Sequence, residues 1–203
     1  MVLSGSVDVA FNPSGGFHHA GPEQASGFCY IDDVALACMI LAEEGKRVLY
    51  LDVDVHHGDG VAYGFYERSD VMTISFHESP ETLFPGTGFV EEIGKGEGKG
   101  YTVNLPLNIG TSGKTYGKIL DDLFFPLAKE FRPDIILVSA GQDAHKSDPI
   151  ASLQFTNQDY IMMTKRIMEV AKLICKKRLV MVLEGGYNLT ALSETISSII
   201  TTM

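Results

Sequence analysis

The chain has 203 residues, of which 45% are hydrophobic and 21% are charged, and its formal net charge is −10. This length and composition fit one soluble globular domain with a sizeable core. The acidic balance, without any basic block, argues against direct binding to nucleic acid or to an anionic membrane. We recognise no signal peptide and no apolar run long enough to cross a bilayer.

The cysteine pattern bears on the cellular compartment. Cys29, Cys38 and Cys175 are odd in number and show no CxxC spacing. A disulfide framework is therefore not expected, and a reducing compartment, the cytoplasm, is favoured. No internal repeat or low-complexity tract divides the chain, so we expect residues 1–203 to form a single domain.

Six short apolar runs predict six strands. They lie at residues 7–11, 47–53, 71–76, 101–107, 134–140 and 179–185. Several are nearly continuous in Val, Ile and Leu, which is typical of strands buried on both faces of a parallel sheet.

Between these runs, apolar residues at helical spacing predict four helices, over residues 27–45, 112–131, 156–177 and 189–203. Pro126 should kink or divide the second helix, and Thr156 can cap the third. Strands that alternate with helices indicate an α/β fold with a mainly parallel sheet.

Chemically useful residues gather where the predicted strands end. The segment "HHAG" follows the first strand, "DVDVHHGDG" the second, "SFHES" the third, "SAGQDAHKSDP" the fifth and "LEGGYN" the sixth. In open parallel sheets, ligands bind at the carboxyl ends of the strands. These five strand ends therefore predict one composite site.

The end of the second strand suggests a metal site. Asp52, Asp54 and His56 are two residues apart, so their side chains project from one face. Asp54 and His56 can reach one cation, and Asp143, from the fifth strand, can add a third ligand. Two carboxylates, one imidazole and a water suit Zn²⁺ or Fe²⁺ with an open position. The alternative is that Asp54 and His56 only cap the helix that follows.

Two adjacent histidines suggest acid–base chemistry. His18 and His19 follow a Gly-Gly turn, and both can line a pocket from a loop. One of them can act as general base for a metal-bound water, and Asp52 and Asp59 are the carboxylates available to orient the two imidazoles. Tyr187, which follows two glycines, can donate a hydrogen bond to a developing oxyanion.

Taken together, five segments resemble the successive motifs of the zinc-dependent histone deacetylase family. They are "GGFHHAGPEQASGFCYIDD", "VLYLDVDVHHGDGV", "SFHES…LFPGTG", "SAGQDAHKSDP" and "LEGGYN". The likeness is closer to archaeal and bacterial members, which are histone-deacetylase-like or acetoin-utilisation-type proteins. The resemblance implies the three-layer arginase/deacetylase-like fold, with helices on both faces of a mainly parallel sheet.

The resemblance also implies roles. Asp54, His56 and Asp143 match the ligands of one zinc ion per chain. His19 matches the histidine that serves as general base and then as general acid, and His18 matches its electrostatic partner.

Asp52 and Asp59 match the carboxylates that orient these histidines, and Tyr187 matches the tyrosine that polarises the amide carbonyl together with zinc. The implied reaction is removal of acetyl groups from acetyl-lysine side chains of proteins by a metal-activated water, without a covalent intermediate.

Further residues match the family's tunnel and a structural cation site. Phe28 and Phe84 match the two sides of the acyl-lysine tunnel, Gly27 matches a tunnel residue that contacts the substrate, and Ile150 stands at the rim.

The family also binds K⁺ or Na⁺ near the zinc; the matching residues are Asp52, Asp54, His56, Ser75 and Phe76. Because the family's domain is considerably longer, the resemblance implies a catalytic domain over residues 1–203 that is incomplete at both ends.

Three alternatives remain open. Arginase-type hydrolases share the implied fold and use two manganese ions held by D-x-H-x-D and D-x-D motifs. Here the order is D-x-D-x-H, and His145 stands two positions after Asp143, so one zinc fits better. Small acetylated amines such as polyamines are another substrate class, although the apolar Ile150 stands where an acid would favour such cations. The third alternative is an inactive fragment of such an enzyme.

Overall fold

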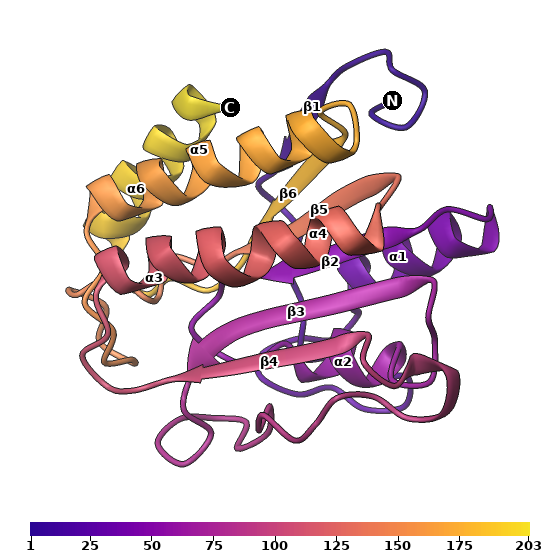
Figure 1. Ribbon diagram of the computed structural model, residues 1–203. Helices are drawn as coiled ribbons and strands as arrows, with labels where there is room; N and C mark the ends of the chain where they lie inside the picture. Colours follow the sequence, from indigo (N-terminus) through magenta and orange to yellow (C-terminus); the bar gives the residue numbers. More distant parts are fainter.

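A six-stranded sheet forms the centre of the protein, which the computed structural model describes over residues 1–203 (Figure 1). Its strands are β1 (Val9–Asn12), β2 (Val48–Asp52), β3 (Val71–Glu78), β4 (Thr102–Leu107), β5 (Ile135–Ala140) and β6 (Leu179–Leu183). They lie in the order β1-β6-β5-β2-β3-β4, and every neighbouring pair is parallel. β2, β3 and β5 are buried at every position, which explains the near-continuous apolar sequences of β2 and β5.

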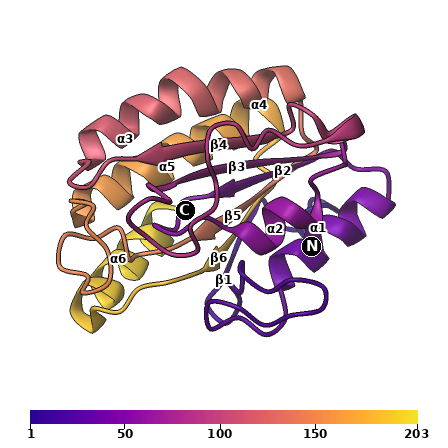
Figure 2. The ribbon, with the colours of Figure 1, turned by 90° about the horizontal axis from the view of Figure 1, so that it is seen from below.

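Helices cover both faces of the sheet (Figure 2). One face carries α1 (Asp33–Glu43) and α2 (Asp59–Gly64), and the other carries α3 (Gly113–Ile119), α4 (Phe125–Phe131) and α5 (Asn157–Ile174). α6 (Leu189–Thr202) packs against α5. The predicted α/β architecture is confirmed, with a separate apolar core on each face of the sheet. None of these helices combines the length and the hydropathy needed to cross a membrane.

The first predicted helix begins later than the sequence suggested. α1 starts at Asp33 rather than at residue 27, and the carboxylate of Asp32 caps it by accepting the N–H of Ala35 at 2.7 Å. Gly27 and Phe28 have φ values of +52° and +65°, which a right-handed helix does not accept. Residues 27–32 therefore form a loop, and this loop reaches the candidate site.

The second predicted helix is modified at its proline but not divided. A π-helical turn, η2 (Leu120–Phe124), joins α3 to α4, and Pro126 lies in the first turn of α4. The proline ring lacks an N–H and crowds the carbonyl four residues earlier, at Asp122. That residue lies inside the wider π turn, so the rod continues through the proline (Figure 1).

The third predicted helix begins at its expected cap. The carboxylate of Asp159 accepts the backbone N–H of Thr156 at 2.8 Å and its hydroxyl at 2.7 Å.

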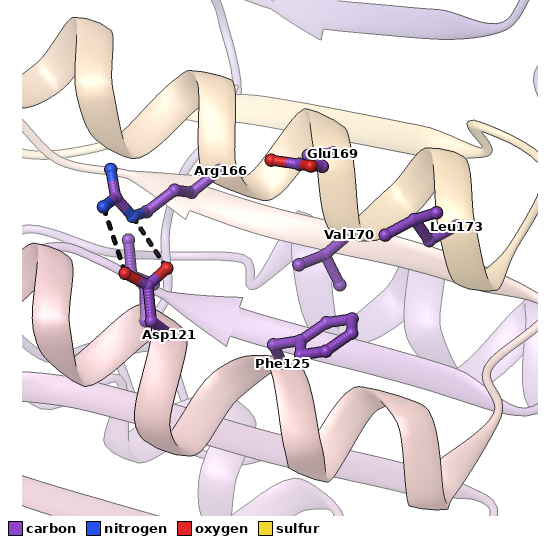
Figure 3. Close-up of a pocket in the computed structure, with 7 residues that line it drawn as sticks. Asp121, Phe125, Arg166, Glu169, Val170 and Leu173 are labelled. Atoms are coloured by element: carbon purple, nitrogen blue, oxygen red, sulfur yellow. Dashed lines mark hydrogen bonds and ion pairs between the residues drawn. The ribbon is translucent and has the colours of Figure 1, made fainter.

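Between α5 and the α3–α4 rod lies a pocket of about 210 Å³ (Figure 3). Arg166 donates two hydrogen bonds to Asp121 there, at 2.8 and 3.0 Å. The paired guanidinium satisfies that carboxylate, and Glu169 is the one further titratable residue that lines the pocket. The pocket therefore lacks the cluster of interacting acid–base groups that a catalytic site needs.

Candidate active site

The three predicted metal ligands meet at the carboxyl edge of the sheet. Asp54 and His56 lie in the turn after β2, and Asp143 lies in the turn after the neighbouring strand β5. One donor atom of each residue lies within 4.8 Å of the other two. Nδ1 of His56 is 2.9 Å from Oδ1 of Asp54 and 3.1 Å from Oδ2 of Asp143. The alternative capping role does not hold, because the N-cap of α2 is Gly58 and no side chain caps this helix.

This cluster fits a metal ion. Oδ2 of Asp143 is buried and accepts no hydrogen bond, which is costly for a carboxylate unless a cation replaces the missing donor. Burial and the nearby charge of Asp54 raise the pKa of Asp143 to about 7. The N–H groups of Val55 and Gly185 orient the two carboxylates, donating to Asp143 at 3.0 Å and to Asp54 at 2.9 Å. Two carboxylates and one imidazole are a ligand set that suits zinc.

His18 and His19 lie side by side in the loop after β1, with their ring centroids 4.0 Å apart. Nδ1 of His18 is 2.8 Å from Oδ2 of Asp52, and Nδ1 of His19 is 2.6 Å from Oδ1 of Asp59. The structure therefore brings together the two pairs that the sequence suggested. A carboxylate on Nδ1 accepts the ring hydrogen there, which leaves Nε2 to exchange protons.

The two imidazoles have opposite pKa shifts. Burial disfavours the charged form of His18, but Glu184, Asp52 and Asp54 outweigh it and raise the pKa of His18 well above its ordinary value. Burial and the neighbouring His18 lower the pKa of His19. At neutral pH, His18 is therefore cationic, and His19 is a neutral imidazole that can accept a proton.

A narrow pocket of about 50 Å³ lies above the histidines. The predicted tunnel residues Gly27, Phe28, Phe84 and Ile150 line it, together with Tyr187, which was predicted to be catalytic. The Phe84 ring centroid is 5.1 Å from that of His19, and the Phe28 ring centroid is 6.3 Å from that of Tyr187. A Cβ atom on Gly27 would collide with the ring of His19, so only glycine lets this loop approach so closely.

The loop after β6 presents Tyr187, and a buried acid that the sequence did not reveal holds this loop. Oδ2 of Asp148 accepts the backbone N–H of Tyr187 at 2.7 Å and that of Asn188 at 3.2 Å. Its Oδ1 accepts the N–H of Ile150 at 3.1 Å. Asp148 thus ties the loop of Tyr187 to the tunnel rim. Burial, Asp143 and Asp54 raise the pKa of Tyr187, so its hydroxyl remains a hydrogen-bond donor.

Glu184 is a second site residue that was not assigned from the sequence. It follows β6 directly, its Oε1 accepts the backbone N–H of His18 at 3.0 Å, and its Oε2 lies 3.9 Å from Nε2 of His18. Burial raises the pKa of Glu184 to about 8. His18, Asp54 and Glu184 form a second group close enough to hold a metal ion, and this group shares Asp54 with the first. The signal that could have found Glu184 is a charge placed directly after a buried strand.

The residues predicted to bind a monovalent cation also lie together. In the β2–β3 register, Asp52 stands opposite Ser75, and Phe76 follows. Oδ1 of Asp52 accepts the N–H of Asp54 at 3.1 Å, and Oγ of Ser75 lies 2.8 Å from Nδ1 of His77. Binding of K⁺ or Na⁺ at this place stays a prediction.

Comparison with known proteins gives the family. The profile of the histone deacetylase domain matches residues 1–203. The chain belongs to this family. A probable deacetylase of Archaeoglobus fulgidus is 45% identical over 207 residues, covering 100% of this chain and 56% of that protein. The acetoin utilization protein AcuC of Bacillus subtilis is 39% identical over 189 residues, covering 93% of this chain and 49% of that protein.

Human histone deacetylase 1 is 42% identical over 150 residues, covering 74% of this chain and 31% of the human protein. Among solved structures, the HDA15 HD domain superposes with a TM-score of 0.90 at 34% identity, covering 98% of this chain and 56% of that one. The family resemblance and the arginase/deacetylase-like fold expected from the sequence are therefore confirmed. The chain spans about half the length of the first of these relatives.

Proposed function

We propose that this chain carries the site of a zinc-dependent deacetylase that removes acetyl groups from lysine side chains of proteins. One observation carries the proposal: the imidazole of His19 lies 2.6 Å from the carboxylate of Asp59, beside a buried cluster that fits a metal ion. Both lie at the base of a narrow pocket with aromatic walls. Water activation needs this combination of base, cation site and restricted access.

The chain's own residues can perform each proton transfer. Zinc held by Asp54, His56 and Asp143 would supply the Lewis acidity that activates water and polarises the acyl carbonyl. His19 accepts a proton from the attacking water at Nε2, while Asp59 holds its Nδ1–H. Tyr187 donates to the carbonyl oxygen as negative charge develops on it. When the carbon–nitrogen bond breaks, the imidazolium returns its proton to the leaving lysine nitrogen.

The pocket walls favour an acylated lysine chain. Phe28 and Phe84 are 81% and 48% exposed, so both present apolar surface to an entering side chain. Ile150 adds a further apolar group at the rim, where a small cationic amine would require an acid. A protein acetyl-lysine therefore fits better than an acetylated polyamine.

The reducing compartment stays a prediction, supported by three cysteines that are all free and buried.

Metal stoichiometry tests the proposal. After dialysis, elemental mass spectrometry should find about one zinc per chain, and Asp143→Ala should lose it. Asp121→Ala is the matched control, because it removes a carboxylate from the pocket between α5 and the α3–α4 rod and should keep the zinc. A peptide assay should then show a higher kcat/KM for acetyl-lysine than for an acetylated diamine.

Other outcomes would redirect the proposal. Two metals per chain, one of them lost in Glu184→Gln, would indicate binuclear hydrolase chemistry through the second acidic group. A preference for the acetylated diamine would indicate the small-amine reaction. If the folded protein takes up no zinc when zinc is supplied, the proposed function is wrong for this chain.

A further inference from the structure

A second pair of buried histidines lies beside the site, and the proposed chemistry does not use it. His57 follows the metal ligand His56, and His77 lies in β3; their exposed fractions are 1% and 0%. Their ring centroids are 4.8 Å apart, with an interplanar angle of 47°. Neither ring has a carboxylate partner. Two buried imidazoles with only neutral partners indicate a positional role rather than proton transfer.

Hydrogen bonds fix the tautomer of His77. Its Nε2 lies 3.0 Å from the carbonyl oxygen of Gly88, which can only accept, so the ring hydrogen is on Nε2. In the neutral ring, Nδ1 then accepts the hydroxyl of Ser75 at 2.8 Å. Burial lowers the pKa of His77 to about 4, in agreement with a neutral ring. His77 is therefore a rigid link between β3 and the loop that contains Gly88.

His57 binds the same loop one residue earlier. Its Nδ1 lies 2.9 Å from Oγ1 of Thr87. Gly88 has a φ of +89°, and a Cβ there would lie 2.5 Å from Nε2 of His77 and 2.7 Å from Cγ of His57. The backbone of Gly88 thus rests directly on both rings, which only glycine permits. Two side chains from two different elements therefore hold two consecutive loop residues.

This loop carries a wall of the tunnel. Phe84 precedes Thr87 by three residues, and its ring centroid is 5.1 Å from that of His19 and 6.4 Å from that of His56. The phenyl ring is half exposed, so packing of the ring alone does not fix it. On the far side of the loop, Oε1 of Glu92 accepts the N–H of Gly88 at 2.9 Å. The position of Phe84 therefore depends on how firmly residues 87 and 88 are held.

We propose that His57 and His77 act as positioning residues that set the place of Phe84, and thereby the width of the tunnel and the size of the acyl group it accepts. This inference rests on the proposed deacetylase function for its substrate, but the placement of the loop is independent of any reaction. The pocket of about 50 Å³ is narrow, so a small displacement of Phe84 changes which acyl groups fit. Loosening either histidine contact should admit longer acyl chains.

The first experiment measures the loop itself. Hydrogen exchange of the amides at residues 84–88 should be about threefold to tenfold faster in Thr87→Val and His77→Leu, because each loses one hydrogen bond to the loop. His77→Gln can place an amide N–H near the former Nε2 and should restore most of the protection. Thr111→Val, which removes a hydroxyl bound to Asn108 on a different loop, is the matched control and should leave residues 84–88 unaffected.

The second experiment measures acyl selectivity. In Thr87→Val, the ratio of kcat/KM for butyryl-lysine to that for acetyl-lysine peptides should rise about threefold to tenfold, mainly through KM, while zinc content stays the same. In a Phe84→Ala background, Thr87→Val should have no further effect on this ratio, because the histidines act through Phe84.

Three results would overturn the inference: unchanged exchange at residues 84–88, faster exchange with unchanged acyl selectivity, or a Thr87→Val effect that persists without Phe84. A wild-type protein that binds zinc but hydrolyses no acyl-lysine would refute the proposed function instead. In that case, binding of a linear aliphatic hydroxamate to the zinc-loaded protein supplies the selectivity measurement. Equal affinities of wild type and Thr87→Val for short and long hydroxamates would then refute the control of tunnel width.

Discussion

The protein contains two buried histidine pairs with similar ring spacing and different partners on their Nδ1 atoms. The rings of His18 and His19 are 4.0 Å apart, and those of His57 and His77 are 4.8 Å apart. In the first pair, each Nδ1 faces a carboxylate, at 2.8 and 2.6 Å. In the second pair, each Nδ1 faces a hydroxyl, at 2.9 and 2.8 Å.

The charges around each ring decide how far burial can lower its pKa: Asp59 only partly offsets burial at His19, whereas several carboxylates outweigh it at His18. The pKa of His18 rises well above its usual value, because carboxylates outweigh burial. Burial lowers the pKa of His57 to about 2 and that of His77 to about 4, since hydroxyls offer no compensating charge. Burial alone therefore makes a histidine inert, and a buried carboxylate beside it makes the same ring useful for proton transfer.

The largest expected difference between the pairs is in the chemical step. His19→Gln should lower kcat by about 10²- to 10⁴-fold, because the general base is lost. His57→Gln should lower kcat by less than about tenfold, because His57 acts on the loop and not on the reacting atoms. Steady-state kinetics on zinc-loaded variants checks both. Equal losses of kcat would show that the two pairs do not differ in role.

Removing a carboxylate should make the first pair resemble the second. Asp59→Asn should lower kcat by roughly 10²-fold, because Nδ1–H of His19 loses its ionic partner. Asp59 also raises the pKa of His19, so its loss should lower that pKa further. Since the base must be unprotonated, the acidic limb of the kcat/KM profile should move to lower pH. A limb that stays in place would mean that another group titrates there.

A smaller effect is expected from the acid that holds Tyr187. In Asp148→Asn, one carboxylate oxygen that accepts two backbone N–H groups is replaced by a weaker acceptor or by a donor. The loop of Tyr187 should loosen, and kcat should fall about tenfold, less than the roughly 10²- to 10³-fold loss expected for Tyr187→Phe. If the double variant is no worse than Tyr187→Phe alone, then Asp148 acts through the tyrosine.

The smallest expected effect on catalysis comes from the second pair, whose loss of a hydrogen bond should lower stability instead. Ser75→Ala leaves Nδ1 of His77 buried without its donor, so the free energy of unfolding should fall by about 1–3 kcal/mol. Urea unfolding measures this change. The acidic limb of the pH profile should stay at its wild-type pH, since neither ring of the second pair titrates near neutrality. A shifted limb would contradict the separation of the two pairs.

Much of the fold follows from local sequence, and the exceptions have physical causes. Runs such as "VLYLD" and "IILVSA" predicted β2 and β5 because both faces of these strands are buried. The predicted start of α1 at residue 27 was wrong, because Gly27 and Phe28 adopt left-handed φ values that hydrophobic periodicity does not reveal. Pro126 was expected to kink or divide a helix, but the π turn before it accommodates the ring and the rod continues.

The site was predictable where its residues follow strands. Asp54, His56 and Asp143 stand at the ends of β2 and β5, and the parallel sheet brings those ends together. Asp148 and Glu184 were missed as site residues because their partners are backbone N–H groups of Tyr187 and His18. Those contacts are made by loops whose paths no local pattern describes.

By itself, the sequence determined the alternation of strands and helices, the spacing of the proposed metal ligands and the position of the proposed catalytic residues at the strand ends. These properties depend on periodicity and on neighbours within a few residues. Only the tertiary structure decided that Asp52 and Asp59 meet His18 and His19, whereas Thr87 and Ser75 meet His57 and His77. The pKa of a buried imidazole depends on the charges within a few ångströms, and the fold places those charges beside it from distant parts of the chain.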